Sequence, residues 1–140
     1  MSNKSNSSPL FWAKLFSVTI TLGGISLQNH TLTTIQLSEM LKQKVPVLLL
    51  DVRDAEKFIT GSLVHENAPT RNVPYLLMKE QDKPFDEETE KLVKNVQIVT
   101  VCTTGNKAQK AAALLREHGF QANALEGGIT AWKEQSNEAK

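Results

Sequence analysis

Two short, mainly apolar runs mark the middle of the chain, at residues 47–50 and 96–101. A continuous run of this length, without strict alternation, is typical of a parallel strand that is covered on both faces. The first run ends abruptly at Asp51-Val52-Arg53-Asp54, and the second ends at Cys102. We therefore expect two buried parallel strands with polar or reactive residues at their carboxyl ends.

Segments with helical periodicity flank these runs. Thr33 or Thr34 can cap a helix over residues 35–42, and Pro46 stops its continuation. After Cys102, apolar side chains recur at the spacing of one helix face, and Gly119 follows as a left-handed stop. The residues on that face are Ala108, Ala111, Ala112 and Leu115.

Three further segments complete the pattern. The charged stretch 87–95 predicts a helix with a solvated face and with Leu92 and Val93 turned inward. Residues 120–125 can form a short strand, and Gly127-Gly128 then turns the chain into a last helix that carries Trp132. Pro69, Pro74 and Pro84 punctuate the connection between the two apolar runs.

Strands that alternate with helices predict an α/β fold, with a parallel sheet flanked by helices on both faces. A length of 140 residues fits one domain. We expect an N-terminal extension over residues 1–29, the domain over 30–136 and a short tail over 137–140.

The N-terminal extension has a different composition from the rest. Residues 1–9 are polar, and the chain from Leu10 to Leu27 is apolar but is interrupted by Lys14 and by Gly23-Gly24. Its uninterrupted part is shorter than the roughly 20 apolar residues that span a bilayer. A secretory signal is one interpretation, yet no small-residue cleavage site follows. We favour a short helix and strand packed on the domain, and a cytoplasmic protein; association with a membrane, or export, through this segment is the alternative.

Composition and charge exclude several classes of protein. The chain has 16 basic and 15 acidic side chains, and no basic stripe is interleaved with aromatic residues, so nucleic acid is not an expected partner. Cys102 is the single cysteine, which excludes an internal disulfide and a multi-cysteine zinc site. His30, His65 and His118 lack metal-ligand spacing, so we expect neither a metal nor another cofactor.

Cys102 is the main candidate for chemistry. Ligands of open α/β sheets bind beyond the carboxyl ends of the strands, where this residue is predicted to lie. The residues that follow it combine small hydroxyl side chains, a glycine and the start of a helix, which are the ingredients of a cradle of backbone amides for an anion. A helix N-terminus and a nearby lysine stabilise a thiolate. The pattern favours a reactive Cys102 over the alternative of a thiol that only packs in the core.

Four motifs, in order along residues 33–134, resemble a single rhodanese (sulfurtransferase) domain. They are Asp51-Val52-Arg53 with Phe58 and Gly61; Cys102-x-x-Gly105-x-Lys107; Ala111-Ala112-x-x-Leu115-x-x-x-Gly119-Phe120; and Leu125-x-Gly127-Gly128-x-x-x-Trp132. The resemblance implies that Cys102 takes a sulfur atom from thiosulfate or a persulfide and passes it to a thiol, cyanide or a partner protein. It also implies that the backbone amides of the loop bind the donor. The binding residues would be Thr103, Thr104, Gly105, Asn106 and Lys107.

The sequence departs from the family pattern in two places. Lys107 stands where many members have Arg, and Lys cannot make the planar two-pronged contact with an oxyanion. Residues 61–69 are longer than the usual stretch, so His65 or Arg71 could project toward the site, although exposed loop positions are the favoured interpretation. For Asp51 and Arg53 we expect a supporting ion pair that ties loops together.

Two other functions compete with sulfur transfer. Phosphatases related to rhodaneses separate the cysteine from an Arg by five residues, whereas four residues separate Cys102 from Lys107 here. The shorter loop favours sulfur over the larger phosphate dianion. A rhodanese-like domain that only binds or regulates a partner is the second alternative.

Overall fold

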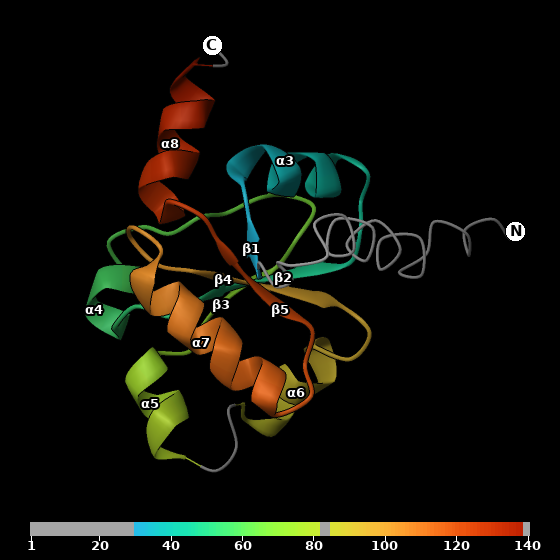
Figure 1. Cartoon of the computed structure of the whole chain (residues 1–140), viewed down its shortest axis with the longest axis vertical. Coiled ribbons are helices and arrows are strands. Elements are labelled where there is room, and N and C mark those ends of the chain that lie inside the picture. The colour runs from blue at the N-terminus through green and yellow to red at the C-terminus, as the bar shows by residue number, and fades with distance from the viewer. Residues whose placement is uncertain (1–29, 82–84, 139–140) are drawn as a thin grey trace, which may run out of the picture.

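A parallel sheet forms the centre of the computed structural model, which describes residues 30–81 and 85–138 (Figure 1). Within these residues the sheet has five strands in the order β1-β5-β4-β2-β3, and all neighbouring strands run parallel. The strands are β1 (Thr31–Leu32), β2 (Val47–Asp51), β3 (Thr70–Asn72), β4 (Gln97–Val101) and β5 (Ala122–Leu125). The two apolar runs thus form the adjacent strands β2 and β4.

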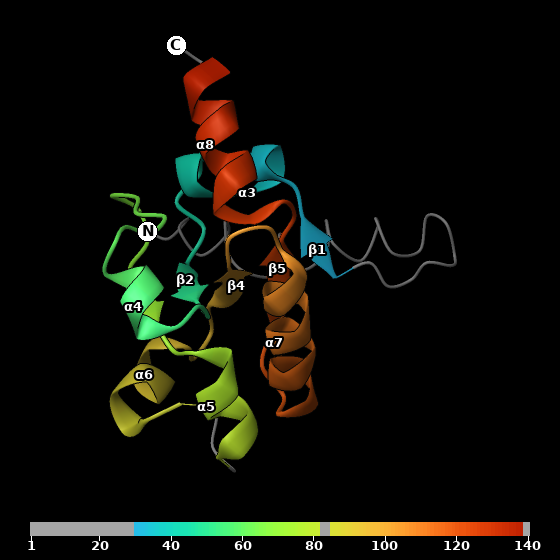
Figure 2. The ribbon, with the colours of Figure 1, turned by 90° about the vertical axis from the view of Figure 1, so that its left-hand side faces the viewer.

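Helices cover both faces of the sheet, as Figures 1 and 2 show. α3 (Thr34–Lys42) and α8 (Gly128–Glu138) contribute to one buried core. α5 (Tyr75–Glu80), α6 (Glu87–Leu92) and α7 (Asn106–Glu117) lie over the other face. The short α4 (Ala55–Phe58) follows β2 and has no buried residue. The predicted α/β fold is confirmed.

Alternation along β2 explains why its first four residues, 47–50, are all apolar. Val47 and Leu49 belong to the core beneath α3 and α8, whereas Leu48 and Leu50 belong to the core beneath α7. Successive side chains of a strand point to opposite faces, so a strand covered on both sides needs apolar residues at every position.

The local signals around α3 and α7 act as predicted. Thr33, the first of the two candidates along the chain, caps α3, and Gln36 completes a capping box with it. The four residues of the α7 stripe are buried, and Gly119 has a φ of +90° where the helix ends. These two helices are therefore defined by their own sequences at both the cap and the buried face.

The prediction for residues 87–95 was partly wrong. α6 ends at Leu92, and Asn95 has a positive φ of 60°, so the chain has left the helix before that residue. Val93 is buried as predicted, but Leu92 is only half-buried and the polar Thr89 is buried instead. Val93 thus reaches the core from the C-cap of α6 and not from within the helix.

Several short elements were not predicted: β1, β3, α4 and α5 have two to six residues each. Elements of this length carry too few positions to display a period. β3 forms only because it pairs with β2, with Arg71 opposite Leu50.

The interpretations of residues 10–27 lie outside the described residues. Among residues 30–81 and 85–138, the structure contains no helix of the length and hydropathy that crossing a bilayer requires.

Candidate active site

The loops that follow β2 and β4 lie next to each other at the carboxyl edge of the sheet. Asp51, the last residue of β2, is the register partner of Val101, the last residue of β4. The N–H of Val52 donates to the carbonyl oxygen of Val101 at 2.9 Å, so the pairing continues to the ends of both strands. Asp51 and Cys102 are thereby brought to the same edge, as the sequence predicted.

Two backbone amides donate hydrogen bonds to the sulfur of Cys102. The N–H of Gly105 lies 3.0 Å from Sγ, and the N–H of Ala108 lies 3.3 Å from it. The residue is 5% exposed and packs beside the α7 stripe. Two N–H donors, one from the loop and one from the first turn of α7, thus converge on a buried sulfur atom.

Gly105 gives the loop its shape. It precedes α7 as the N-cap with a φ of +110°, a conformation that strains any residue with a side chain. A Cβ atom at this position would also lie 3.3 Å from the nitrogen of Gly127. Around it, the side chains of Thr103, Thr104, Asn106 and Lys107 are exposed. The predicted binding residues therefore lie together, in the loop after β4 and in the first turn of α7.

The start of α8 holds the loop from the other side. The N–H of Ile129 donates to the carbonyl oxygen of Cys102 at 2.9 Å, and the N–H of Thr130 donates to that of Thr103 at 3.1 Å. Gly128 allows this approach: a Cβ there would lie 2.5 Å from the oxygen of Thr103 and nearer still to that of Cys102. The first two carbonyl groups of the loop are thus occupied by α8.

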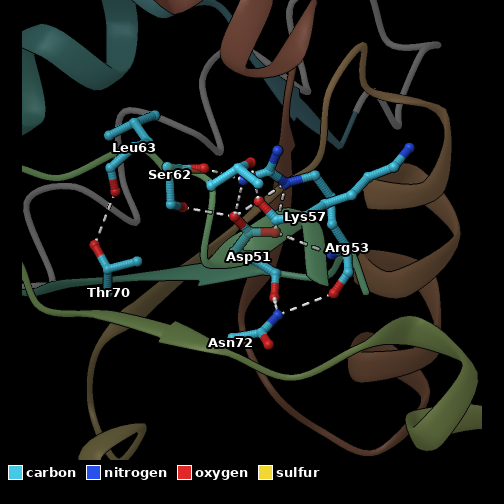
Figure 3. A network of polar contacts seen from close by, with 9 residues as sticks. Asp51, Arg53, Lys57, Ser62, Leu63, Thr70 and Asn72 are labelled. Carbon is cyan, nitrogen blue, oxygen red and sulfur yellow. Dashed lines mark hydrogen bonds and ion pairs between the residues drawn. The ribbon is translucent and has the colours of Figure 1, made fainter. Parts of the chain in front are cut away.

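The loop after β2 is organised by side chains instead (Figure 3). Asp51 is fully buried, and its carboxylate accepts from the guanidinium of Arg53, with Nη2 at 2.8 Å from Oδ2. Ser62 donates its hydroxyl to the same carboxylate oxygen at 2.6 Å, and Arg53 also donates to the carbonyl oxygen of Gly61. The bonds that the ion pair makes with Ser62 and Gly61 thus join the end of β2 to the segment that follows α4.

Asn72 and Thr70 extend this network to β3. The side-chain amide of Asn72 donates to the carbonyl oxygens of Asp51 and Arg53, at 3.0 and 2.9 Å. Thr70 donates its hydroxyl to the carbonyl oxygen of Leu63 at 2.9 Å. The segment 61–69, which departs from the family pattern, is therefore tied to β2 through Ser62 and to β3 through Leu63, and the carbonyl oxygen of Pro69 accepts from the N–H of Leu49 in β2 at 2.9 Å.

Other residues singled out in the sequence have contacts of their own. The ring of His65 accepts from the N–H of Asn67 at 3.0 Å. Arg71 is exposed and lines a cavity of about 440 Å³ together with residues of α5 and α6, such as Leu77 and Glu88. Trp132 is half-buried against the core beneath α3 and α8. Over the described part of the chain, no three His, Cys, Asp or Glu side chains are grouped as metal ligands.

Sequence reasoning missed Ala108, Ser62 and the contribution of α8. Ala108 and α8 act at the loop through backbone N–H groups, and these leave no mark in the identity of the side chain. Ser62 lies in an irregular segment, where nothing in the pattern connects it to Asp51. Gly128 was noted as a turn residue and as part of the fourth motif, but its contact with the loop, which its lack of a Cβ permits, was not predicted.

Comparison with known proteins assigns most of the chain to one family. The family model that matches is described as Rhodanese-like domain, and it covers residues 33–135. Thiosulfate sulfurtransferase GlpE of Pseudoalteromonas translucida is 30% identical over 95 residues, which are 66% of this chain and 79% of that protein.

A longer relative and a solved structure agree with this match. A Zea mays protein named adenylyltransferase and sulfurtransferase MOCS3-2 is 37% identical over 89 residues. The chain spans only 17% of the length of that protein, and 62% of this chain is covered. A rhodanese-like domain protein of Staphylococcus aureus superposes with a TM-score of 0.56 at 28% identity, covering 74% of this chain and 91% of that chain.

Proposed function

The chain belongs to the rhodanese-like domain family, and from this premise we propose that it is a sulfurtransferase that carries a sulfur atom on Cys102. The observation that supports this most directly is the pair of amides, from Gly105 and Ala108, that donate to Sγ. A sulfur atom surrounded by N–H donors is prepared to act as a thiolate nucleophile. Relatives of this chain are named as sulfurtransferases.

The proposed reaction has two half-reactions. The Cys102 thiolate attacks the outer sulfur of thiosulfate, the S–S bond of the donor breaks, and sulfite leaves with the bonding electron pair. Cys102 is then a persulfide. A nucleophilic acceptor attacks the terminal sulfur, and the electron pair of the S–S bond returns to Cys102 as a thiolate. With cyanide as the acceptor, the product is thiocyanate; a persulfide donor, or a thiol or protein acceptor, enters the same scheme.

The loop would hold the anionic groups of this reaction. The donor and the persulfide both carry negative charge, which backbone N–H groups of the loop from Thr103 to Lys107 can stabilise. The ammonium of Lys107 adds a single positive charge in the first turn of α7. An ammonium cannot make the planar two-pronged contact of a guanidinium, so we expect thiosulfate to bind weakly. Having Lys instead of Arg at position 107 should therefore raise KM for thiosulfate more than it lowers kcat.

Asp51 and Arg53 are assigned a supporting role. Their ion pair, together with Ser62, fixes the loop that borders the site, and both carboxylate oxygens of Asp51 are already occupied by donors. A carboxylate in this state is poorly suited to exchange protons with a substrate.

Intact-mass measurement tests the proposal. We expect incubation with thiosulfate to add one sulfur atom to the chain, and cyanide to remove it with release of thiocyanate. Cys102→Ser is the matched control, since it keeps the size of the side chain and removes the only thiol. Absence of a sulfur adduct with both thiosulfate and a low-molecular-weight persulfide would contradict the proposal.

One observation favours a binding module as the second candidate, namely that Cys102 is only 5% exposed. A thiol that no reagent reaches would serve packing alone. Alkylation of the native protein by iodoacetamide distinguishes the two, because an active site must admit a small electrophile. Turnover of an aryl phosphate that is lost in Cys102→Ser would instead indicate a phosphatase.

A further inference from the structure

Thr100 places a hydroxyl group inside the core directly below the candidate active site. The residue is 0% exposed and lies in β4, two positions before Cys102. Residues two apart on a strand point to the same face. The side chain of Thr100 therefore points toward α7, where Leu48, Leu50 and Ile98 form an otherwise apolar core.

The hydroxyl of Thr100 donates to the first turn of α7. Its Oγ1 lies 2.8 Å from the carbonyl oxygen of Ala108, and 3.5 Å from that of Asn123. A hydroxyl has one proton to donate, and the shorter distance is that of a good O–H···O bond. Ala108 is also the residue whose N–H donates to the sulfur of Cys102 at 3.3 Å. One residue of α7 is thus held by β4 on one side and directed at the sulfur on the other.

The carbonyl oxygen of Ala108 has a hydrogen-bond donor within α7 and does not need this hydroxyl. In an α-helix each interior carbonyl accepts from the N–H four residues later, which α7 supplies because it runs to Glu117. Valine has nearly the same shape as threonine and carries no polar group into a core. The hydroxyl is therefore not explained by packing or by hydrogen-bond satisfaction alone.

We propose that Thr100 is a positioning residue, which sets the place of the Ala108 N–H relative to the sulfur of Cys102 and so promotes the thiolate. The inference deepens the proposed function, because it concerns how the same cysteine is activated. It concerns the thiol before any donor is bound, so it is testable without a sulfur donor.

The test compares two pairs of variants that differ by the hydroxyl group. In the first pair, Thr100→Val is compared with the wild type and lacks the hydroxyl at nearly the same side-chain shape. In the second pair, Thr100→Ala is compared with Thr100→Ser, so the hydroxyl is removed from a smaller side chain. The readout is the rate of alkylation of Cys102 by iodoacetamide as a function of pH. The second pair keeps the test valid if Thr100→Val does not fold.

Charged groups on the elements around the loop are the same in every variant. They include Lys107 and Lys110 on α7, Asp51 at the end of β2, Arg53 after it, and Glu126 before α8. A difference in the pH profile within a pair is therefore due to the hydroxyl.

We expect the variants without a hydroxyl to be alkylated about two- to tenfold more slowly at neutral pH, the effect of one hydrogen bond, and to reach the wild-type rate at higher pH. Thr100→Ser should react like the wild type. Identical pH profiles within both pairs would overturn the proposal, and so would a Thr100→Ser rate as slow as that of Thr100→Ala. A failure to form the persulfide, with these alkylation differences intact, would contradict the proposed function but not this role of Thr100.

Discussion

The loops after β2 and β4 start side by side, yet one is held in place mainly by side chains and the other mainly by backbone groups. At the end of β2, the side chains of Arg53 and Ser62 both donate to the carboxylate of Asp51. After β4, the contacts are made by backbone groups: two N–H groups point at the sulfur of Cys102, and two from α8 hold the loop carbonyls.

This difference determines which substitutions each loop tolerates. A loop held by side chains is disrupted by deleting a side chain. A loop held by its backbone is disrupted by adding one, where a glycine permits a close approach or a positive φ. The following predictions test this contrast, from the largest expected effect to the smallest.

Gly128→Ala should have the largest effect on stability, because the added Cβ would lie 2.5 Å from the backbone oxygen of Thr103. We expect a loss of more than about 4 kcal/mol in the free energy of unfolding, or a chain that does not fold. Gly119→Ala is the matched control: its φ of +90° is also positive, but no atom lies within 4 Å of the new Cβ. Chemical denaturation of both variants measures the difference. Equal losses would show that strain in φ, rather than contact with the Cys102 loop, is responsible.

Asp51→Ala should cost about 3 kcal/mol, because it leaves the guanidinium of Arg53, 11% exposed, without its buried partner. The double variant Asp51→Ala/Arg53→Ala should lose less than the sum of the two single variants, as measured by a double-mutant cycle of urea unfolding. Because the sulfur is held by the other loop, alkylation of Cys102 in the folded fraction should change little. A strictly additive cycle would mean that the ion pair does not organise this loop.

Gly105→Ala should cost about 1–2 kcal/mol in stability and should also slow the alkylation of Cys102. The new Cβ meets the nitrogen of Gly127 at 3.3 Å, and any shift moves the N–H that donates to the sulfur. Gly61→Ala, in the loop after β2, is the control, since it has a positive φ and open space for a Cβ. If both variants alkylate at the wild-type rate while folded, the Gly105 amide has no part in the reactivity of the thiol.

Asp86→Asn tests a helix cap that lies outside both loops. The N–H of Thr89 donates to this exposed carboxylate, which caps α6, and the hydrogen bond lowers the pKa of Asp86. A lowered pKa in the folded state stabilises the protein above the ordinary pKa of Asp and ceases to do so as pH falls through the folded value. Asn caps a helix without titrating. The stability difference between the wild type and the variant should therefore fall as the pH drops below the ordinary Asp pKa of about 3.9 and through the lowered folded value, as measured by urea unfolding. A difference that is independent of pH would contradict the assigned charge effect.

The sequence predicted the parts of the molecule that side chains specify. The apolar residues of β2, the stripe of α7 and the Thr33 cap each stand in the sequence as a recognisable pattern. The position of Cys102 at the end of a buried run, before a glycine and a helix, was enough to place it at the carboxyl edge.

The remaining features depend on backbone groups or on distant partners. Nothing in the residue Ala108 shows that its N–H reaches a sulfur, and Ile129 contacts the loop through its amide alone. α4, α5 and β3 are too short for their own sequence to define them, and the rest of the fold decides where they form. Thr100 was not singled out in the run 96–101, and the bond of its hydroxyl to Ala108 depends on how α7 packs on the sheet.

The contact between α8 and the Cys102 loop also sets an order of events during synthesis. Cys102 leaves the ribosome before Ile129 and Thr130, whose amides hold the carbonyls of Cys102 and Thr103. Until those residues emerge, we expect the only thiol of the chain to lie in a segment without these two hydrogen bonds. The thiol of the nascent chain should therefore react with oxidants and electrophiles at a rate that differs from that in the finished fold.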